Sequence, residues 1–154
     1  MKAIIPDDPK KNARLWRELE AREEDMVKKA EELAIRMKAA FEEKERLSEK
    51  KNKERQLRNI QEMAEQSTSW AEVELFIRYQ AARGEIPTAW AQQAIEILGD
   101  LQTMARGIAQ RALNSQPDEV VKKVHLELVR RVLGYTVRWH VWHAKGESQQ
   151  PGGR

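Results

Sequence analysis

Residues 69–113 constrain the fold most strongly, because their sequence predicts two amphipathic helices joined by a connection of only a few residues. Ser69 and Glu72 have the spacing of a capping box, in which the serine accepts a backbone N–H of the first turn and the glutamate reaches back to the cap. Gly84 offers a left-handed C-cap, and Pro87 opposes continuation of the helix. Helices joined so closely usually fold back antiparallel. The segment therefore predicts a helical hairpin.

Apolar side chains recur at spacings of three and four residues on both predicted helices, which places them on one face of each helix. After Leu113, Pro117 predicts a further helix start, because proline fits the first turn of a helix. The last helix has the most regular apolar stripe in the chain, formed by Val121, Val124, Leu128, Val132, Tyr135, Trp139 and Trp142. Gly134 lies inside this pattern and indicates a close crossing of two helices.

A long, charged helix is predicted to occupy residues 9–58. Asp8 can cap it, and Pro9 fits its first position. Apolar residues recur along it every seven residues, with a second line four residues further on that Glu23 interrupts, and this is the pattern of a coiled-coil seam. The seam can pack against the chain's own helices or against a partner, and both alternatives stay open at this point. The residues assigned to this candidate protein interface are Leu19, Met26, Leu33, Met37 and Leu47.

These patterns divide the chain into four regions and predict an all-α helical bundle of about five helices. Residues 1–8 form an N-terminal arm, and residues 9–58 form the long heptad-patterned helix. Residues 59–143 form the core of the bundle. Residues 144–154 hold no large apolar side chain that could anchor them, so they predict a disordered tail.

The composition limits the chemistry and the compartment that suit this chain. Its 154 residues suit one domain, and 40% apolar with 34% charged residues means that an ionised surface encloses a modest core. The absence of cysteine removes disulfides, thiolate metal sites and cysteine nucleophiles, and it fits a reducing cytosol. No stretch approaches the roughly 18 apolar residues that a membrane span needs. We therefore expect a cytoplasmic protein with no membrane partner.

The sequence offers little support for catalysis or for a bound cofactor. His140 and His143 lie three residues apart on the last predicted helix, but no carboxylate at helical spacing accompanies them as a further metal ligand. The glycines are scattered through helical sequence, whereas a phosphate-binding loop needs them clustered between a strand and a helix. Neighbouring carboxylates lie among lysines and are typical of a solvated surface. We therefore expect neither an enzyme nor a metal or cofactor site.

The excess of basic residues lies at the C-terminal end of the chain. Residues 103–154 hold nine basic and four acidic side chains, whereas residues 67–102 hold two and five. Guanidinium groups can pair with phosphate oxygens through two hydrogen bonds, so a line of arginines can follow a nucleic-acid backbone without reading its bases. An ordinary soluble surface is the alternative. The candidate RNA-binding residues are Arg106, Arg111, Lys122, Lys123, Arg130, Arg131 and Arg138, with Arg78 and Arg83 as an extension.

Residues 57–83 hold a further pattern that begins with a short apolar helix and a serine and threonine break. The next helix contains the pentapeptide Phe-Ile-Arg-Tyr-Gln from Phe76 to Gln80, and Arg83 follows three residues later. This pattern resembles the small all-helical subunit of type III CRISPR effector complexes. It covers about a fifth of the chain, which is too little to fix a fold by analogy alone. The charged N-terminal helix and the tryptophan-rich last helix have no counterpart in it.

The resemblance implies a non-catalytic subunit of a ribonucleoprotein complex in antiviral defence. Several copies would stack along the guide–target RNA duplex, with basic residues on the RNA backbone and other faces on larger protein subunits. The resemblance also implies Arg78 and Arg83 as RNA contacts. The alternative function is that of a coiled-coil structural or adaptor protein, which recruits a partner or associates with itself through the N-terminal heptad helix.

Overall fold

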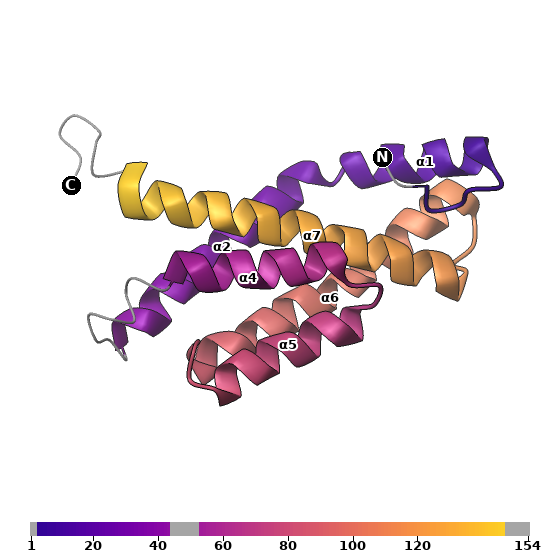
Figure 1. Cartoon of the computed structure of the whole chain (residues 1–154). Helices are drawn as coiled ribbons and strands as arrows, with labels where there is room; N and C mark the ends of the chain where they lie inside the picture. The colour runs from indigo at the N-terminus through magenta and orange to yellow at the C-terminus, as the bar shows by residue number, and fades with distance from the viewer. Residues whose placement is uncertain (1–2, 44–52, 147–154) are drawn as a thin grey trace.

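The computed structural model describes residues 3–43 and 53–146, and the fold is stated for these residues alone. They form an all-α bundle without strands, as predicted, but with six α-helices in place of about five (Figure 1). The helices are α1 (Pro9–Glu20), α2 (Glu23–Glu43), α4 (Lys53–Gln66), α5 (Trp70–Ala82), α6 (Thr88–Leu113) and α7 (Asp118–Val141), followed by the short π-helix η1 (Trp142–Gly146). Within the described residues, no helix combines the length and apolar character needed to cross a membrane.

The helix α7 lies at the centre of the bundle, because α2, α4 and α6 all pack against it (Figure 1). Most of its circumference is buried, as expected of a helix whose apolar residues extend beyond a narrow stripe. The helix α1 packs on α6, and α5 packs on α4 and α6. The apolar side chains of all six helices join in one core. The large side chains at its centre are Trp90, Leu15, Leu19, Met26, Leu33, Met37, Leu57, Ile60, Ile77, Leu98, Leu101 and Ile108.

The hairpin of α5 and α6 follows the local signals in its sequence. Ser69 caps α5, because its Oγ accepts the backbone N–H of Glu72 at 3.3 Å. The Glu72 carboxylate reaches back to the backbone N–H of Thr68 at 3.0 Å, one residue further than a capping box requires. Gly84 takes a positive φ of 79° and ends the helix in the left-handed conformation that glycine tolerates best. The next helix begins at Thr88, directly after Pro87.

The predicted long helix is interrupted, and this part of the prediction is wrong. The helix α1 ends at Glu20, and α2 begins at Glu23. No proline or glycine marks this break, which has a tertiary cause: α1 packs on α6, whereas α2 packs on α7. The two helices must therefore follow different directions. Residues 44–52 lie outside the described part of the chain, and α4 begins as a separate helix at Lys53.

The heptad seam faces the interior of this chain. Leu19, Met26, Leu33 and Met37 are fully buried in the common core. They offer no apolar surface to a partner helix in this fold, which removes their assignment to a protein interface. Leu47 lies outside the described residues. Intramolecular packing is therefore the alternative that accounts for the seam over α1 and α2.

Two tryptophan side chains tie α2 to its neighbours. The indole N–H of Trp90 on α6 donates to the Leu33 carbonyl at 3.1 Å. The indole N–H of Trp139 on α7 donates to the Val27 carbonyl at 2.9 Å. A buried indole needs such an acceptor, because its unpaired N–H would lose its bond to water. The helix α2 is thus held by hydrogen bonds from both α6 and α7 as well as by apolar contact.

The predicted N-terminal arm is also attached to the fold where it is described. The Asn12 side chain accepts backbone N–H groups from Ile4 at 2.7 Å and from Ile5 at 3.1 Å. Ile4 is buried in the core. At the other end, η1 extends to Gly146, and the remainder of the predicted tail lies outside the described residues.

Candidate nucleic-acid interface

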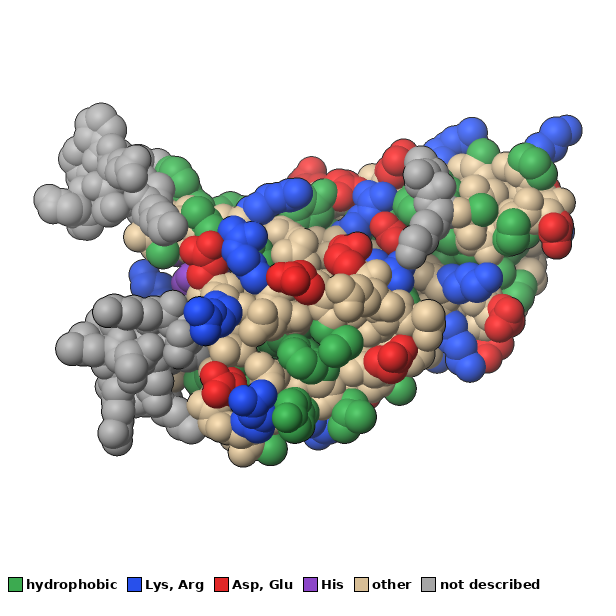
Figure 2. All heavy atoms as spheres, in the orientation of Figure 1, with side chains coloured by type: hydrophobic (Ala, Val, Ile, Leu, Met, Phe, Trp, Pro, Cys, Tyr) green, Lys and Arg blue, Asp and Glu red, His purple; other side chains and the backbone are tan. Residues whose placement is uncertain are grey.

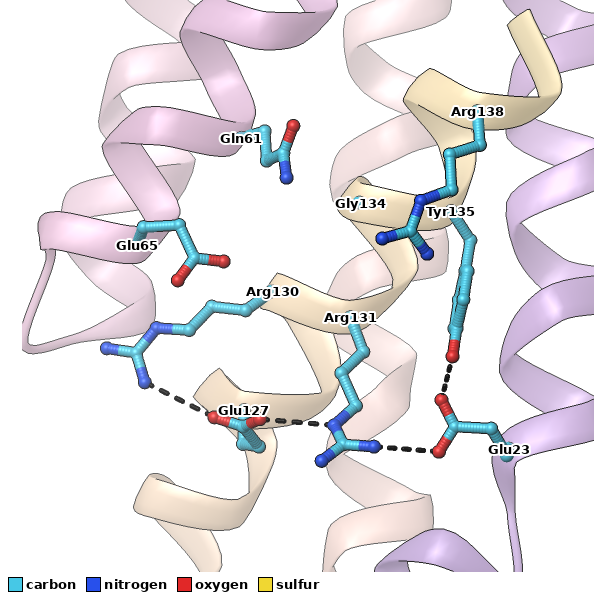
Figure 3. Close-up of a pocket in the computed structure, with 9 residues that line it drawn as sticks. All are labelled: Glu23, Gln61, Glu65, Glu127, Arg130, Arg131, Gly134, Tyr135 and Arg138. Carbon is cyan, nitrogen blue, oxygen red and sulfur yellow. Dashed lines mark hydrogen bonds and ion pairs between the residues drawn. The ribbon is translucent and has the colours of Figure 1, made fainter. Parts of the chain in front are cut away.

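A polar groove with a cavity volume of about 240 Å³ lies where α2, α4 and α7 meet (Figure 3). Three of the predicted RNA-binding residues, Arg130, Arg131 and Arg138, line it from α7. Their spacings of one to eight residues place them toward one side of that helix. The full lining consists of Glu23, Gln61, Glu65, Glu127, Arg130, Arg131, Gly134, Tyr135 and Arg138.

Gly134 allows α4 to pass close to α7 at this groove. A Cβ atom added at Gly134 would lie 3.4 Å from Nε2 of Gln61, which is a tight contact. This agrees with the close helix crossing predicted from a glycine inside an apolar stripe. The crossing brings the polar residues of α4 beside the arginines of α7.

Arg131 is held by carboxylates from two helices. Its Nη1 lies 2.7 Å from Glu23 on α2, and its Nε donates to Glu127 on α7 at 3.1 Å. Its guanidinium also lies 5.4 Å from the centre of the Trp16 ring. Burial opposes the charge on Arg131, but the hydrogen bonds and charges of Glu127 and Glu23 outweigh burial and raise the pKa of the guanidinium.

Tyr135 completes this network from the next turn of α7. Its hydroxyl donates to the second carboxylate oxygen of Glu23, so Glu23 joins Arg131 and Tyr135 to α2 (Figure 3). The hydrogen bond to Glu23, followed by burial and the negative charge of Glu23, raises the pKa of the Tyr135 hydroxyl. The contact between α2 and α7 thus includes a polar cross-link at the end of α2 nearest α1.

Arg130 makes a second cross-link, from α7 to the end of α4. Its Nε donates to the Ala64 carbonyl and its Nη2 donates to the Ser67 carbonyl, each at 2.9 Å. The last carbonyls of a helix have no partner within the helix, so Arg130 acts as a C-terminal cap supplied from another element. An ion pair of 3.5 Å to Glu127 completes its contacts. Arg130 and Arg131 therefore hold the bundle together, and phosphate binding through their guanidinium groups would break these bonds.

Arg138 differs from the other two arginines of the groove. It is exposed, and its guanidinium lies 5.3 Å from the centre of the Tyr135 ring. No carboxylate among the described residues forms an ion pair with it. Of the three groove arginines, Arg138 is the one that can accept a phosphate without losing an internal ion pair.

The other predicted RNA-binding residues lie on separate parts of the surface. On α5, Arg78 pairs with Glu74 at 2.8 Å, and Arg83 lies 5.3 Å from the centre of the Tyr79 ring. On α7, Lys122 pairs with Asp118 at 3.1 Å. Figure 2 shows basic and acidic side chains interleaved over this face, so the nine residues do not form one basic strip. The exposed cations that form no ion pair with a described residue are Arg106, Arg111, Lys123 and Arg138.

The sequence-based assignment missed the acidic half of the groove. Glu23, Glu65 and Glu127 face the arginines from three helices (Figure 3). One signal was present, because Glu127 precedes Arg130 by three residues and Arg131 by four, which are pairing distances on a helix. The approach of Glu23 had no local signal, since it depends on how α2 packs against α7.

Replacing Glu23 by alanine should lower the free energy of unfolding by about 1–3 kcal/mol, because Arg131 and Tyr135 would lose a shared acceptor in a half-buried place. Urea denaturation followed by tryptophan fluorescence would measure this loss. Glu24→Ala is the matched control, since Glu24 is exposed and pairs only with Lys28 one turn away. Such a pair contributes about 0.3–0.5 kcal/mol. Equal losses in both variants would contradict the cross-link.

The described residues include no group of three or more histidine and acidic side chains that could hold a metal ion. A scan against protein-family models and searches of curated proteins and of solved structures each found no match to the chain. The resemblance of residues 57–83 to a CRISPR subunit therefore stays a prediction.

Proposed function

We propose that the protein is a non-catalytic RNA-binding subunit of a CRISPR-type ribonucleoprotein, which follows the backbone of a guide–target RNA duplex and contacts larger protein subunits. The observation that carries RNA binding is the set of four exposed cations on the last two helices. They are Arg106 and Arg111 on α6 and Lys123 and Arg138 on α7, and none forms an ion pair with a described residue. Cations without an internal partner can bind phosphate without breaking the fold.

The ion pairs inside the groove support the same proposal. Glu23 and Glu127 are bound by Arg131, and Glu127 is also bound by Arg130. Their negative charge is thereby balanced within the protein, so it opposes an approaching phosphate less than free carboxylates would. The network also holds α7 in place against α2 and α4. Arg130 and Arg131 thus serve the proposed interface as supports, and Arg138 serves it as a contact.

Binding of this kind depends on charge and not on base sequence. We expect similar affinity for RNA molecules of unrelated sequence, and a steep fall in affinity as salt rises, because each phosphate contact releases counterions. Replacing Arg106, Arg111, Lys123 and Arg138 together by glutamine should weaken binding about tenfold or more at low salt. The slope of log affinity against log salt should become shallower by about 0.7–0.9 for each cation that no longer meets a phosphate.

The matched control removes four exposed cations from other helices, namely Lys10 and Arg17 on α1, Lys38 on α2 and Arg55 on α4. Both variants lose the same charge, so a difference between them reports position and not net charge. Fluorescence anisotropy with labelled single-stranded and duplex RNA would measure affinity, and circular dichroism would confirm the fold. Equal weakening in both variants would show a diffuse charge effect, and absence of binding by the unaltered chain would contradict the proposal.

A further inference from the structure

The helix α5 has apolar side chains on two opposite faces. Its inner face buries Val73 and Ile77 against α4 and α6. Its outer face exposes 67% of Leu75 and 52% of Tyr79, the two most exposed large apolar side chains of the described residues. Ala71 and Ala82 are also exposed and lie on this outer face. In Figure 2, apolar side chains are visible over the helix α5 at the lower edge of the molecule.

A helix that is apolar all round is usually covered on both sides, and a contiguous exposed apolar patch usually marks an interaction site. The outer face of α5 meets this description, because Leu75 and Tyr79 are one turn apart and therefore lie side by side. The large exposed apolar side chain of α2, Ile35, has no large apolar neighbour one turn away, since Glu31 and Ala39 occupy those positions.

The charges that border this face are ordered along the helix. Glu72 and Glu74 lie in its first half, whereas Arg78 and Arg83 lie at its C-terminal end. Glu74 and Arg78 are one turn apart and form an ion pair of 2.8 Å along one border. Glu72 and Arg83 are eleven residues apart, about three full turns, so they share the other border. Each border thus begins with an acidic and ends with a basic side chain.

We propose that a second copy of this chain covers the outer face of α5, with the two α5 helices packed antiparallel about a two-fold axis. With Leu75 placed opposite Tyr79 of the second copy, Glu74 lies near Arg78 of that copy, and Glu72 lies near Arg83 of that copy. The symmetry repeats every contact, as in any interface between identical surfaces. A parallel arrangement would instead place like charges opposite each other. The order of charges therefore selects an antiparallel pair.

One helix face is smaller than the roughly 800 Å² per partner of a standard stable interface. The association is therefore reversible, and the monomer keeps a complete core without it. The proposal does not depend on RNA binding, because the exposed cations of α6 and α7 take no part in this contact. It assigns Arg78 and Arg83 to protein contact in place of RNA contact.

Sedimentation equilibrium of the full chain after nuclease treatment tests the proposal. The unaltered chain should pass from monomer to dimer as its concentration rises toward the millimolar range. Leu75→Glu should weaken dimer formation about tenfold or more, because a charge would enter the apolar centre of the contact. Ile35→Glu is the matched control, since Ile35 is 50% exposed on α2 and lies outside the proposed contact. Circular dichroism should show the same helix content in both variants.

A charge exchange tests the antiparallel arrangement itself. Glu74→Arg should weaken the dimer, because it places an arginine near Arg78 of the second copy, and Arg78→Glu should weaken it for the corresponding reason. The combined variant should restore dimer formation, since each border again joins opposite charges. Failure of the combined variant to associate more tightly than either single variant would overturn this arrangement.

Three other results would overturn the proposal. These are a chain that stays monomeric at all concentrations, a dimer that Leu75→Glu leaves unchanged, and equal weakening by Leu75→Glu and Ile35→Glu. A monomeric chain whose RNA affinity falls on Leu75→Glu would assign the face to RNA. Unchanged RNA affinity in a Leu75→Glu variant that no longer dimerises would instead support the two-fold contact and leave the proposed RNA interface on α6 and α7 intact.

Discussion

A chain that begins at Lys53 should lose its cooperative thermal unfolding transition. The deletion removes α1 and α2, and α2 packs more extensively on α7 than any other helix does. It would expose the side of α7 that α2 covers, and the indole N–H groups of Trp90 and Trp139 would lose the acceptors at Leu33 and Val27. Loss of a whole layer of the core exceeds the stability of about 5–15 kcal/mol that a domain of this size has.

Near-UV circular dichroism provides the measurement, because four of the five tryptophans remain in the shortened chain. Their signal should collapse even if part of the helical far-UV signal persists, as in a compact state without fixed packing. A shortened chain with an unchanged near-UV spectrum and a sharp transition would contradict the role of α2 as a wall of the core.

Replacing Trp90 by alanine should lower the free energy of unfolding by about 3–5 kcal/mol, the usual cost of truncating a large buried aromatic side chain. Trp90 is fully buried on α6, and its loss would leave a cavity beside α2 in addition to removing the hydrogen bond to Leu33. Most of the stability expected for this chain would be lost, so the variant should be partly unfolded at room temperature.

Chemical denaturation of Trp90→Ala beside Trp142→Ala separates this effect from the general loss of a tryptophan. Trp142 is 38% exposed at the start of η1, so its replacement should cost much less. Trp90→Phe should be intermediate, because it keeps most of the apolar volume but not the N–H donor. Similar stabilities for Trp90→Ala and Trp142→Ala would contradict the placement of Trp90 at the centre of the core.

The parts of the fold that depend on neighbouring residues were predictable from the sequence. The Ser69 cap, the left-handed Gly84 and the helix start after Pro117 are each set by side-chain and backbone chemistry within one turn. The apolar stripe of the last helix likewise follows from spacing alone. These features recur in the structure because no distant contact competes with them.

The features that depend on distant residues were not predictable in the same way. The break between α1 and α2 arises because the two helices pack on different partners, and residues 20–23 contain no helix-breaking residue. Arg130 and Arg131 have the composition of a phosphate site, but their partners include the Ala64 carbonyl and Glu23, which lie far away in the sequence. A basic residue cannot be assigned to RNA from sequence until its internal partners are known.

Glu23 also determines which of several similar ways of docking α2 is adopted. A heptad surface nearly repeats itself, so an α2 helix displaced by seven residues along its axis would again present apolar side chains to α7. Such a displacement in one direction would bring Ala30 to the place of Glu23, and the half-buried Arg131 would then lack a carboxylate from α2. The one polar member of an otherwise apolar line thus excludes the shifted register, at a point where apolar packing alone would be degenerate.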